Sequence, residues 1–300
     1  MPVKLTLGPV LFNWPPEKWR DFYFSVADEA SIDEVYLGEV VCSKRSPFID
    51  PLVPEVIQRL EAGGKQVILA TLAEIMLPRE RQMTAGVCAV ENYLVEANDV
   101  SALYHLKGKP HRVGPFVNVY NELTLAELAA HGARHVTLAP EIPVTSVALL
   151  AEAARAHNVT LEVQVYGRVP LALSARCYHA RAHGRTKDNC QFVCEADPDG
   201  MVLRTMDGKD FLAVNGVQTL SYHCLNLARE IPALQRMGIR SFRLSPHSQD
   251  MLQVIRIFRR VVDGGLSGAA ALPQLEQMGL QVPFVNGFYH KQPGCHFVNQ

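Results

Sequence analysis

Four cysteines of this chain have a spacing that could bind one metal centre. Cys42 follows the apolar run of residues 35–41, and Cys177, Cys190 and Cys194 lie in one short polar segment with the spacing Cys-x12-Cys-x3-Cys. Four thiolates are the ligand set of a [4Fe–4S] cluster or of a tetrahedral zinc ion. The residue types therefore predict a centre in which Cys42, Cys177, Cys190 and Cys194 are the metal and cofactor ligands.

The spacing favours an iron–sulfur cluster over structural zinc. Zinc sites are usually built from paired Cys-x2–4-Cys elements, whereas here only Cys190 and Cys194 form such a pair and the other two cysteines stand singly. Zinc ligation and unligated cysteines are the alternatives. A radical cluster of the Cys-x3-Cys-x2-Cys type is disfavoured, because Cys194 is followed by Glu195, Ala196 and Asp197 with no third cysteine.

The remaining cysteines indicate a reducing compartment. Cys88, Cys224 and Cys295 have no partner at a ligand spacing, and we expect them to be ordinary buried thiols. A total of seven cysteines, an odd number, argues against a disulfide framework. The first residues do not resemble a secretory signal, and no segment offers about 18 uninterrupted apolar residues. We therefore expect a cytoplasmic protein.

Composition sets the scale of the fold and excludes some functions. A chain of 300 residues with 48% hydrophobic residues can bury one large core. The net charge of -1 gives no global reason to expect nucleic-acid binding, and the basic run Arg256–Arg260 is expected to be the solvated face of a helix. The sequence contains no dinucleotide-binding loop, P-loop, zincin helix or serine-hydrolase elbow.

Short apolar runs alternate with helical patterns along the chain, as in repeated βα units. Eight strands suggest a closed, TIM-barrel-like α/β fold, which we expect to form a single domain over residues 1–300. The expected strands are Lys4–Val10, Glu34–Glu39, Gln66–Thr71, Leu94–Asn98, Arg112–Val119, His135–Pro140, Leu161–Val165 and Ser241–Leu244. The expected helices are Pro15–Glu29, Pro51–Ala62, Leu123–His131, Val144–His157, Tyr222–Met237 and Gln249–Asp263.

The alternation breaks once, at residues 168–220, which we expect to be a cluster-binding insertion after the seventh strand. A small hairpin is predicted within it at Met201–Val214, turned at Asp207-Gly208. In a barrel, Cys42 would lie beyond the second strand and the other three cysteines beyond the seventh. Both positions are at the carboxyl ends of the strands, where barrel enzymes place their active sites.

Polar residues near the predicted strand ends are candidates for substrate contact, with loop hydrogen bonding or helix capping as the alternative. They are Asn13, Glu39, Asn98, Asn118, Asn121, Glu141, Tyr166, Arg168 and Arg176. His179 and His183 lie between the cysteines and are expected to support the ligands or to lie on the surface. His247 and Glu195 receive no role, and the sequence assigns no catalytic residue.

The segment from Val165 to His179 resembles the collagenase-like peptidase family, whose members carry a Gly-x-x-Pro-x-x-x-Ser-x-x-Cys element before a cysteine cluster. Gly167, Pro170, Ser174 and Cys177 occupy that pattern. The resemblance implies a barrel-like core with a [4Fe–4S] cluster on the four cysteines named above. It also implies oxygen-independent hydroxylation of the ubiquinone ring by a heterodimer with a homologous chain, and a lipid-binding accessory protein of that pathway as a further partner.

Proteolysis is not favoured by the residues, since it needs an activated nucleophile or a metal-bound water. A cluster ligated by four cysteines supplies neither, and it suits electron transfer or a structural role better. Three alternatives stay open: a non-catalytic cluster-bearing scaffold, a peptidase, and an enzyme that hydroxylates an RNA base.

Overall fold

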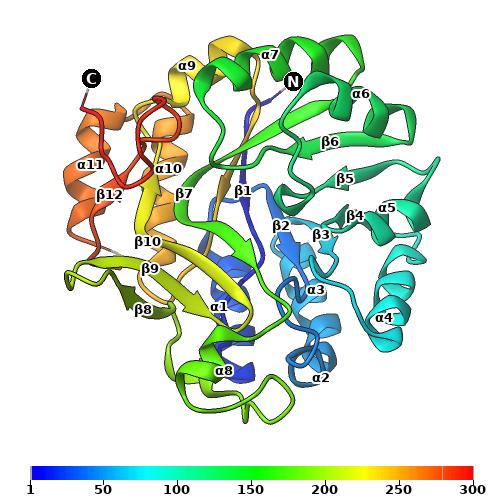
Figure 1. Cartoon of the computed structure of the whole chain (residues 1–300). Helices are drawn as coiled ribbons and strands as arrows, with labels where there is room; N and C mark the ends of the chain where they lie inside the picture. Colours follow the sequence, from blue (N-terminus) through cyan, green and yellow to red (C-terminus); the bar gives the residue numbers. More distant parts are fainter. Residues whose placement is uncertain (1, 279, 300) are drawn as a thin grey trace.

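The computed structural model describes residues 2–278 and 280–299. In this part of the chain eight parallel strands close into a barrel, in the order β1 to β7 and then β11, which pairs with both β7 and β1 (Figure 1). The strands are β1 (Lys4–Leu7), β2 (Glu34–Leu37), β3 (Gln66–Ala70), β4 (Leu94–Ala97), β5 (His111–Val113), β6 (Ala133–Thr137), β7 (Thr160–Leu173) and β11 (Ser241–Leu244). Each overlaps a predicted strand, so the predicted TIM-barrel-like fold is confirmed.

Helices surround the barrel. They are α1 (Pro16–Glu29), α2 (Ser46–Ile49), α3 (Val53–Ala62), α4 (Pro78–Cys88), α5 (Val100–Leu106), α6 (Glu122–Ala130), α7 (Val144–Ala156), α8 (Tyr178–Ala182), α9 (Ile231–Met237), α10 (Met251–Val262) and α11 (Gly268–Glu276). In α10 the side chains of Val254, Phe258 and Val261 are buried at helical spacing, while Arg256 and Arg260 are exposed. The basic run is therefore a solvated helix face, as predicted. None of the helices in the described ranges is long and apolar enough to cross a membrane.

The predicted helix Tyr222–Met237 is wrong in its first half. Residues Gln218–Asn226 form strand β10, and only Ile231–Met237 are helical, as α9. β10 pairs antiparallel with the end of β7 and with β9 (Asp210–Asn215). β7 is distant in sequence, whereas β9 precedes β10 directly, and pairing with both strands overrides a weak local helical pattern. Helices α2, α4, α5, α8 and α11 were not predicted. α2, α5 and α8 are short, α4 is mostly polar, and α11 contains a proline, Pro273.

Strand β7 continues beyond the barrel and carries a small antiparallel sheet, in the order β7, β10, β9 and β8 (Met201–Arg204). The β8–β9 hairpin turns through Gly208, whose φ is +82°, so the hairpin predicted at Asp207-Gly208 is confirmed. A two-residue loop, Gly216-Val217, joins β9 to β10. A remaining short strand, β12 (Phe284–Val285), pairs with β10. In Figure 1 helices α2 and α8 lie at the same lower end of the barrel.

Buried ion pairs fill part of the barrel interior. Arg243 contacts both Glu96 and Glu162, with 2.6 Å between its Nη2 and Oε2 of Glu162. Arg112 donates to both carboxylate oxygens of Glu34, at 2.6 and 2.9 Å. Each buried charge is paired, which offsets the cost of removing it from water.

Candidate metal centre at the carboxyl end of the barrel

The loop that holds Cys42 is fixed by Gly38 and Glu39. Gly38 has φ +143°, and a Cβ atom there would lie 2.4 Å from the carbonyl oxygen of Ala70, so the close approach to β3 requires glycine. Oε1 of Glu39 accepts hydrogen bonds from the backbone N–H groups of Val41 (2.7 Å) and Cys42 (2.9 Å). These contacts turn the chain sharply after β2 and set the position of Cys42.

The other three cysteines lie in the insertion and are each less than a tenth exposed. Cys177 is the N-cap of α8, and its Sγ accepts a hydrogen bond from the backbone N–H of Ala180 at 3.4 Å. Cys190 lies in the loop after α8. Cys194 lies in a 3-10 turn (Val193–Ala196), and its Sγ accepts a hydrogen bond from Nδ2 of Asn13 at 3.4 Å.

The structure brings the four predicted ligands into one site. Cys177 and Cys190 belong to one apolar cluster, against which Cys42 packs. Burial raises the pKa of Cys177, and the neighbouring thiols of Cys42 and Cys190 raise it further. Burial likewise raises the pKa of Cys194, which Cys177 also influences. Thiols that affect one another's charge in this way are near neighbours.

Arg45 is a buried cation within this site, with 3% of its side chain exposed. Its Nη1 donates to the carbonyl of Leu11 at 3.1 Å, and its Nη2 lies 2.7 Å from Oδ1 of Asn215 and 3.9 Å from Sγ of Cys194. Nε of Arg45 has no hydrogen-bond partner among the described residues. A guanidinium beside thiols favours their deprotonated, metal-binding form.

The spacing of the four cysteine sulfurs can be compared with the spacing in a zinc site. Within the described ranges no three of the four cysteine sulfurs lie within 4.8 Å of one another. Four sulfurs bound to zinc at about 2.3 Å would be about 3.8 Å apart. A larger centre suits the wider spacing, and the N–H donors of Asn13, Ala180 and Arg45 are the kind of groups that surround cluster sulfurs.

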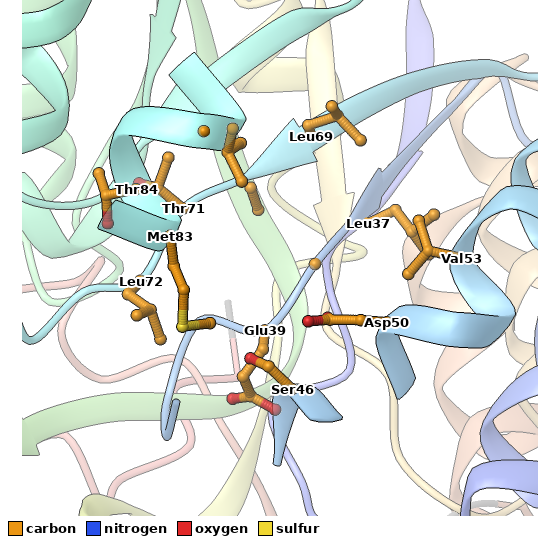
Figure 2. Close-up of a pocket in the computed structure, with 14 residues that line it drawn as sticks. Leu37, Glu39, Ser46, Asp50, Val53, Leu69, Thr71, Leu72, Met83 and Thr84 are labelled. Carbon is orange, nitrogen blue, oxygen red and sulfur yellow. The ribbon is translucent and has the colours of Figure 1, made fainter. Parts of the chain in front are cut away.

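A cavity of about 340 Å³ adjoins the Cys42 loop (Figure 2). Its wall is largely apolar and includes Leu37, Val53, Leu69, Leu72 and Met83. The carboxyl groups of Glu39 and Asp50 also line it. Burial raises the pKa of both carboxyl groups, although Arg45 opposes this at Glu39. The cavity can therefore take an apolar or aromatic molecule beside a protonatable group that contacts the cysteine loop.

Of the other polar candidates, only Asn13 and Glu39 belong to this site. Asn121 caps α6, because its Oδ1 accepts a hydrogen bond from the backbone N–H of Thr124 at 2.9 Å. Helix capping was the alternative to substrate contact for these residues, and it applies to Asn121. Asn118 and Glu141 line a separate rim cavity of about 260 Å³. Glu195 is exposed, as is Arg176.

The remaining candidates lie deeper in the fold. Asn98 is buried and donates from Nδ2 to the carbonyl of Thr71 at 3.2 Å. The hydroxyl of Tyr166 is 2.9 Å from Nε2 of His247. Arg168 donates to the carbonyl of Ser221 at 2.9 Å. Asn98 thus joins the ends of β4 and β3, whereas the contacts of Tyr166 and Arg168 hold β7 to its neighbours.

Cys88 and Cys224 are buried away from the site, as predicted, but Cys295 is exposed, so that part of the prediction is wrong. Residues near Cys295 form surface turns with little apolar content to bury. Sequence reasoning also missed Arg45. The sequence marks Arg45 only by its position three residues after Cys42. Lys44 is a basic residue at almost the same position, so the sequence does not distinguish the two.

Comparison with known proteins gives a family and several distant folds. The sequence profile of Peptidase family U32 matches residues 22–298. An uncharacterized B. cereus protein is similar at 13% identity and a TM-score of 0.44, over 81% of this chain and 61% of that chain. A putative fructose-1,6-biphosphate aldolase from Coccidioides immitis is similar at 11% identity and a TM-score of 0.42, over 92% of this chain and 89% of that chain. The C-terminal domain of a putative chitinase from Desulfitobacterium hafniense DCB-2 is similar at 10% identity and a TM-score of 0.41, over 92% of this chain and 99% of that chain. This chain thus spans 61% of the length of the B. cereus protein.

Proposed function

The chain belongs to peptidase family U32, and from that premise we propose that it is an iron–sulfur protein whose [4Fe–4S] cluster is held by Cys42, Cys177, Cys190 and Cys194. One observation carries the proposal. Two loops that are far apart in sequence bring four thiols together around a buried arginine at the carboxyl end of the barrel. Four thiols beside a buried cation are a suitable ligand set for an iron–sulfur cluster.

A [4Fe–4S] cluster would supply one-electron transfer at this position. Residues of the chain would tune and shield it. Asn13 and the N–H of Ala180 donate to ligand sulfurs, and Arg45 offsets thiolate charge. Such hydrogen bonds and charges set the potential of thiolate-bound iron. The apolar packing of Val41, Ala180 and Val217 limits water around the sulfurs.

Within the family the chain resembles UbiV, through the Tyr36–Cys42 element and the ending Val285–His290. We infer a role as one subunit of an oxygen-independent hydroxylase in ubiquinone biosynthesis, with a UbiU-like homologous partner and a lipid-binding accessory protein. The apolar cavity beside Glu39 is compatible with an aromatic quinone precursor. A cluster-bearing scaffold without chemistry of its own is the alternative.

Proteolysis and RNA-base hydroxylation have less support. Burial raises the pKa of Cys42, Cys177 and Cys194, so without a metal these thiols are poor nucleophiles. The net charge of -1 gives no general attraction for RNA.

The proposal is tested by purifying the chain without oxygen and measuring its metal and sulfide. We expect a brown protein with about four irons and four sulfides per chain, and loss of both in air. One zinc ion per chain, with no visible charge-transfer absorption, would contradict the cluster.

A further inference from the structure

Three side chains of the insertion form a second candidate metal site, separate from the cysteines. His179 and His183 are four residues apart on α8 and its C-cap, and Asp197 follows the 3-10 turn that contains Cys194. One ligand atom from each lies within 4.8 Å of the other two. The two imidazole rings are nearly parallel, with an angle of 4° and 5.3 Å between their centroids.

Hydrogen bonds fix which nitrogen of each ring can bind a metal. Nδ1 of His179 is 3.1 Å from the carbonyl oxygen of Val214, and Nδ1 of His183 is 3.0 Å from the carbonyl oxygen of His179. A carbonyl oxygen only accepts, so each Nδ1 carries the hydrogen. In the neutral ring Nε2 then presents a lone pair. Metal-binding histidines commonly donate their other N–H to a backbone carbonyl in this way.

The contact between His179 and Asp197 is unusual for a simple hydrogen bond. Nε2 of His179 is 3.0 Å from Oδ2 of Asp197, yet this nitrogen has no well-directed hydrogen-bond partner within the described ranges. His179 is fully buried. Two electron-pair donors at this distance need a cation between them or a proton on the ring. Two ligands in adjacent octahedral positions, at bond lengths of about 2.1 Å, are about 3.0 Å apart.

We propose that Nε2 of His179, Nε2 of His183 and the carboxylate of Asp197 bind one divalent first-row transition metal ion. Two imidazoles and one carboxylate suit Zn²⁺ and Fe²⁺ alike. Asp197 is about one-third exposed and His183 lies at the surface, so an ion can enter and retain water. The proposal goes beyond the iron–sulfur function and does not depend on it.

Such an ion would stabilise the segment that carries three of the cysteines. Cys177 and His179 lie on or next to the same short helix, and Asp197 directly follows the 3-10 turn that contains Cys194. An ion bound by both elements would cross-link them. Binding at the histidines would therefore order the cysteine segment before any cluster is present.

The test compares metal binding in full-length variants without an affinity tag. Parent protein, His183→Ala and Asp197→Asn are treated with a chelator, then titrated with Zn²⁺ or, without oxygen, with Fe²⁺. All variants keep the seven cysteines, so binding to thiols is common to them. We expect the parent to bind one ion more than His183→Ala, and Asp197→Asn to bind that ion at least about tenfold more weakly.

His157→Ala is the matched control, since His157 is an exposed histidine at the end of α7. It should keep the parent stoichiometry. Far-ultraviolet circular dichroism checks that each variant is folded. Binding of either ion that depends on both His183 and Asp197 supports the site. Equal stoichiometry and affinity in the parent and His183→Ala would overturn it. Acid-labile sulfide, measured separately, reports on the cysteine cluster alone.

Discussion

Nη2 of Arg45 lies 2.7 Å from Oδ1 of Asn215, and this hydrogen bond joins the loop after β2 to the end of β9. Asn215 in turn donates from Nδ2 to the carbonyls of Cys194 and Asp197, at 2.9 and 2.8 Å. The buried pair therefore connects the segment of Cys42 to that of Cys194.

Replacing Arg45 by Met should destabilise the protein and reduce its iron content. The change removes the hydrogen bonds to Leu11 and Asn215, and it leaves buried Glu39 without its cation. Loss of buried bonds to a charged group costs about 2–3 kcal/mol in the free energy of unfolding. Urea denaturation of air-exposed protein measures the stability, and anaerobic iron analysis measures the cluster. Arg176→Met, at an exposed arginine, is the control and should change neither.

Gly216→Ala should be more harmful than Gly208→Ala. Both glycines have positive φ, +69° and +82°, so alanine strains both by about 1 kcal/mol. Only at Gly216 would the new Cβ also lie 2.5 Å from Nη2 of Arg45, whereas the space at Gly208 is open. Thermal denaturation and iron content of the two variants separate backbone strain from displacement of Arg45. Equal effects would mean that the contact with Arg45 is unimportant.

Each proposed cluster ligand should be needed for the cluster. Replacement of Cys42, Cys177, Cys190 or Cys194 by Ala should remove most of the iron and sulfide, because the part of the chain that the structure describes places no other cysteine in the site. Cys88→Ala and Cys295→Ala should retain both, since these residues are elsewhere in the fold. If Cys224→Ala empties the site while Cys42→Ala does not, the assignment of the distant ligand is wrong.

Stability should fall as the pH is lowered from about 6.5 to 4, partly because of His247. Burial lowers its pKa to about 4, while the unfolded chain has a value of about 6.5. Nδ1 of His247 accepts a hydrogen bond from the backbone N–H of Gln249 at 3.2 Å. A proton on this nitrogen would break that bond, so protonation of His247 in the folded state is unfavourable. The unfolded state binds more protons in this window, which removes up to about 3 kcal/mol of stability at pH 4.

Urea denaturation across this range, compared between the parent and His247→Gln, measures the effect. The variant should be less stable near pH 7 and should depend less on pH. His157→Ala, at an exposed histidine, should follow the parent curve. An unchanged slope in His247→Gln would show that other groups cause the acid sensitivity.

The proposed pathway predicts a heterodimer with a defined phenotype. Co-expression with a UbiU-like chain should give one monodisperse complex by light scattering. Its interface should be largely uncharged at the centre, as stable contacts usually are. Cells that lack this chain should lose ubiquinone synthesis without oxygen and keep it with oxygen. Full anaerobic synthesis in those cells would refute the role.

Local sequence determined the barrel and the four cysteines. Most barrel strands contain a short apolar run and several surrounding helices have strong periodicity, so these elements could be predicted from neighbouring residues alone. The cysteines were identified by residue type and spacing, and their place at the carboxyl ends of β2 and β7 follows from the parallel barrel.

Tertiary structure decided the rest of the site. Strand β10 forms because β7 and β9 pair with it, and no local pattern encodes its pairing with β7, which is distant in sequence. Arg45 looks like any charged loop residue until Leu11 and Asn215 surround it. His179 and His183 are spaced like many surface histidines, and only the fold brings Asp197 to them. A polar side chain acquires its role from contacts across the chain, which pairing, burial and loop closure create together.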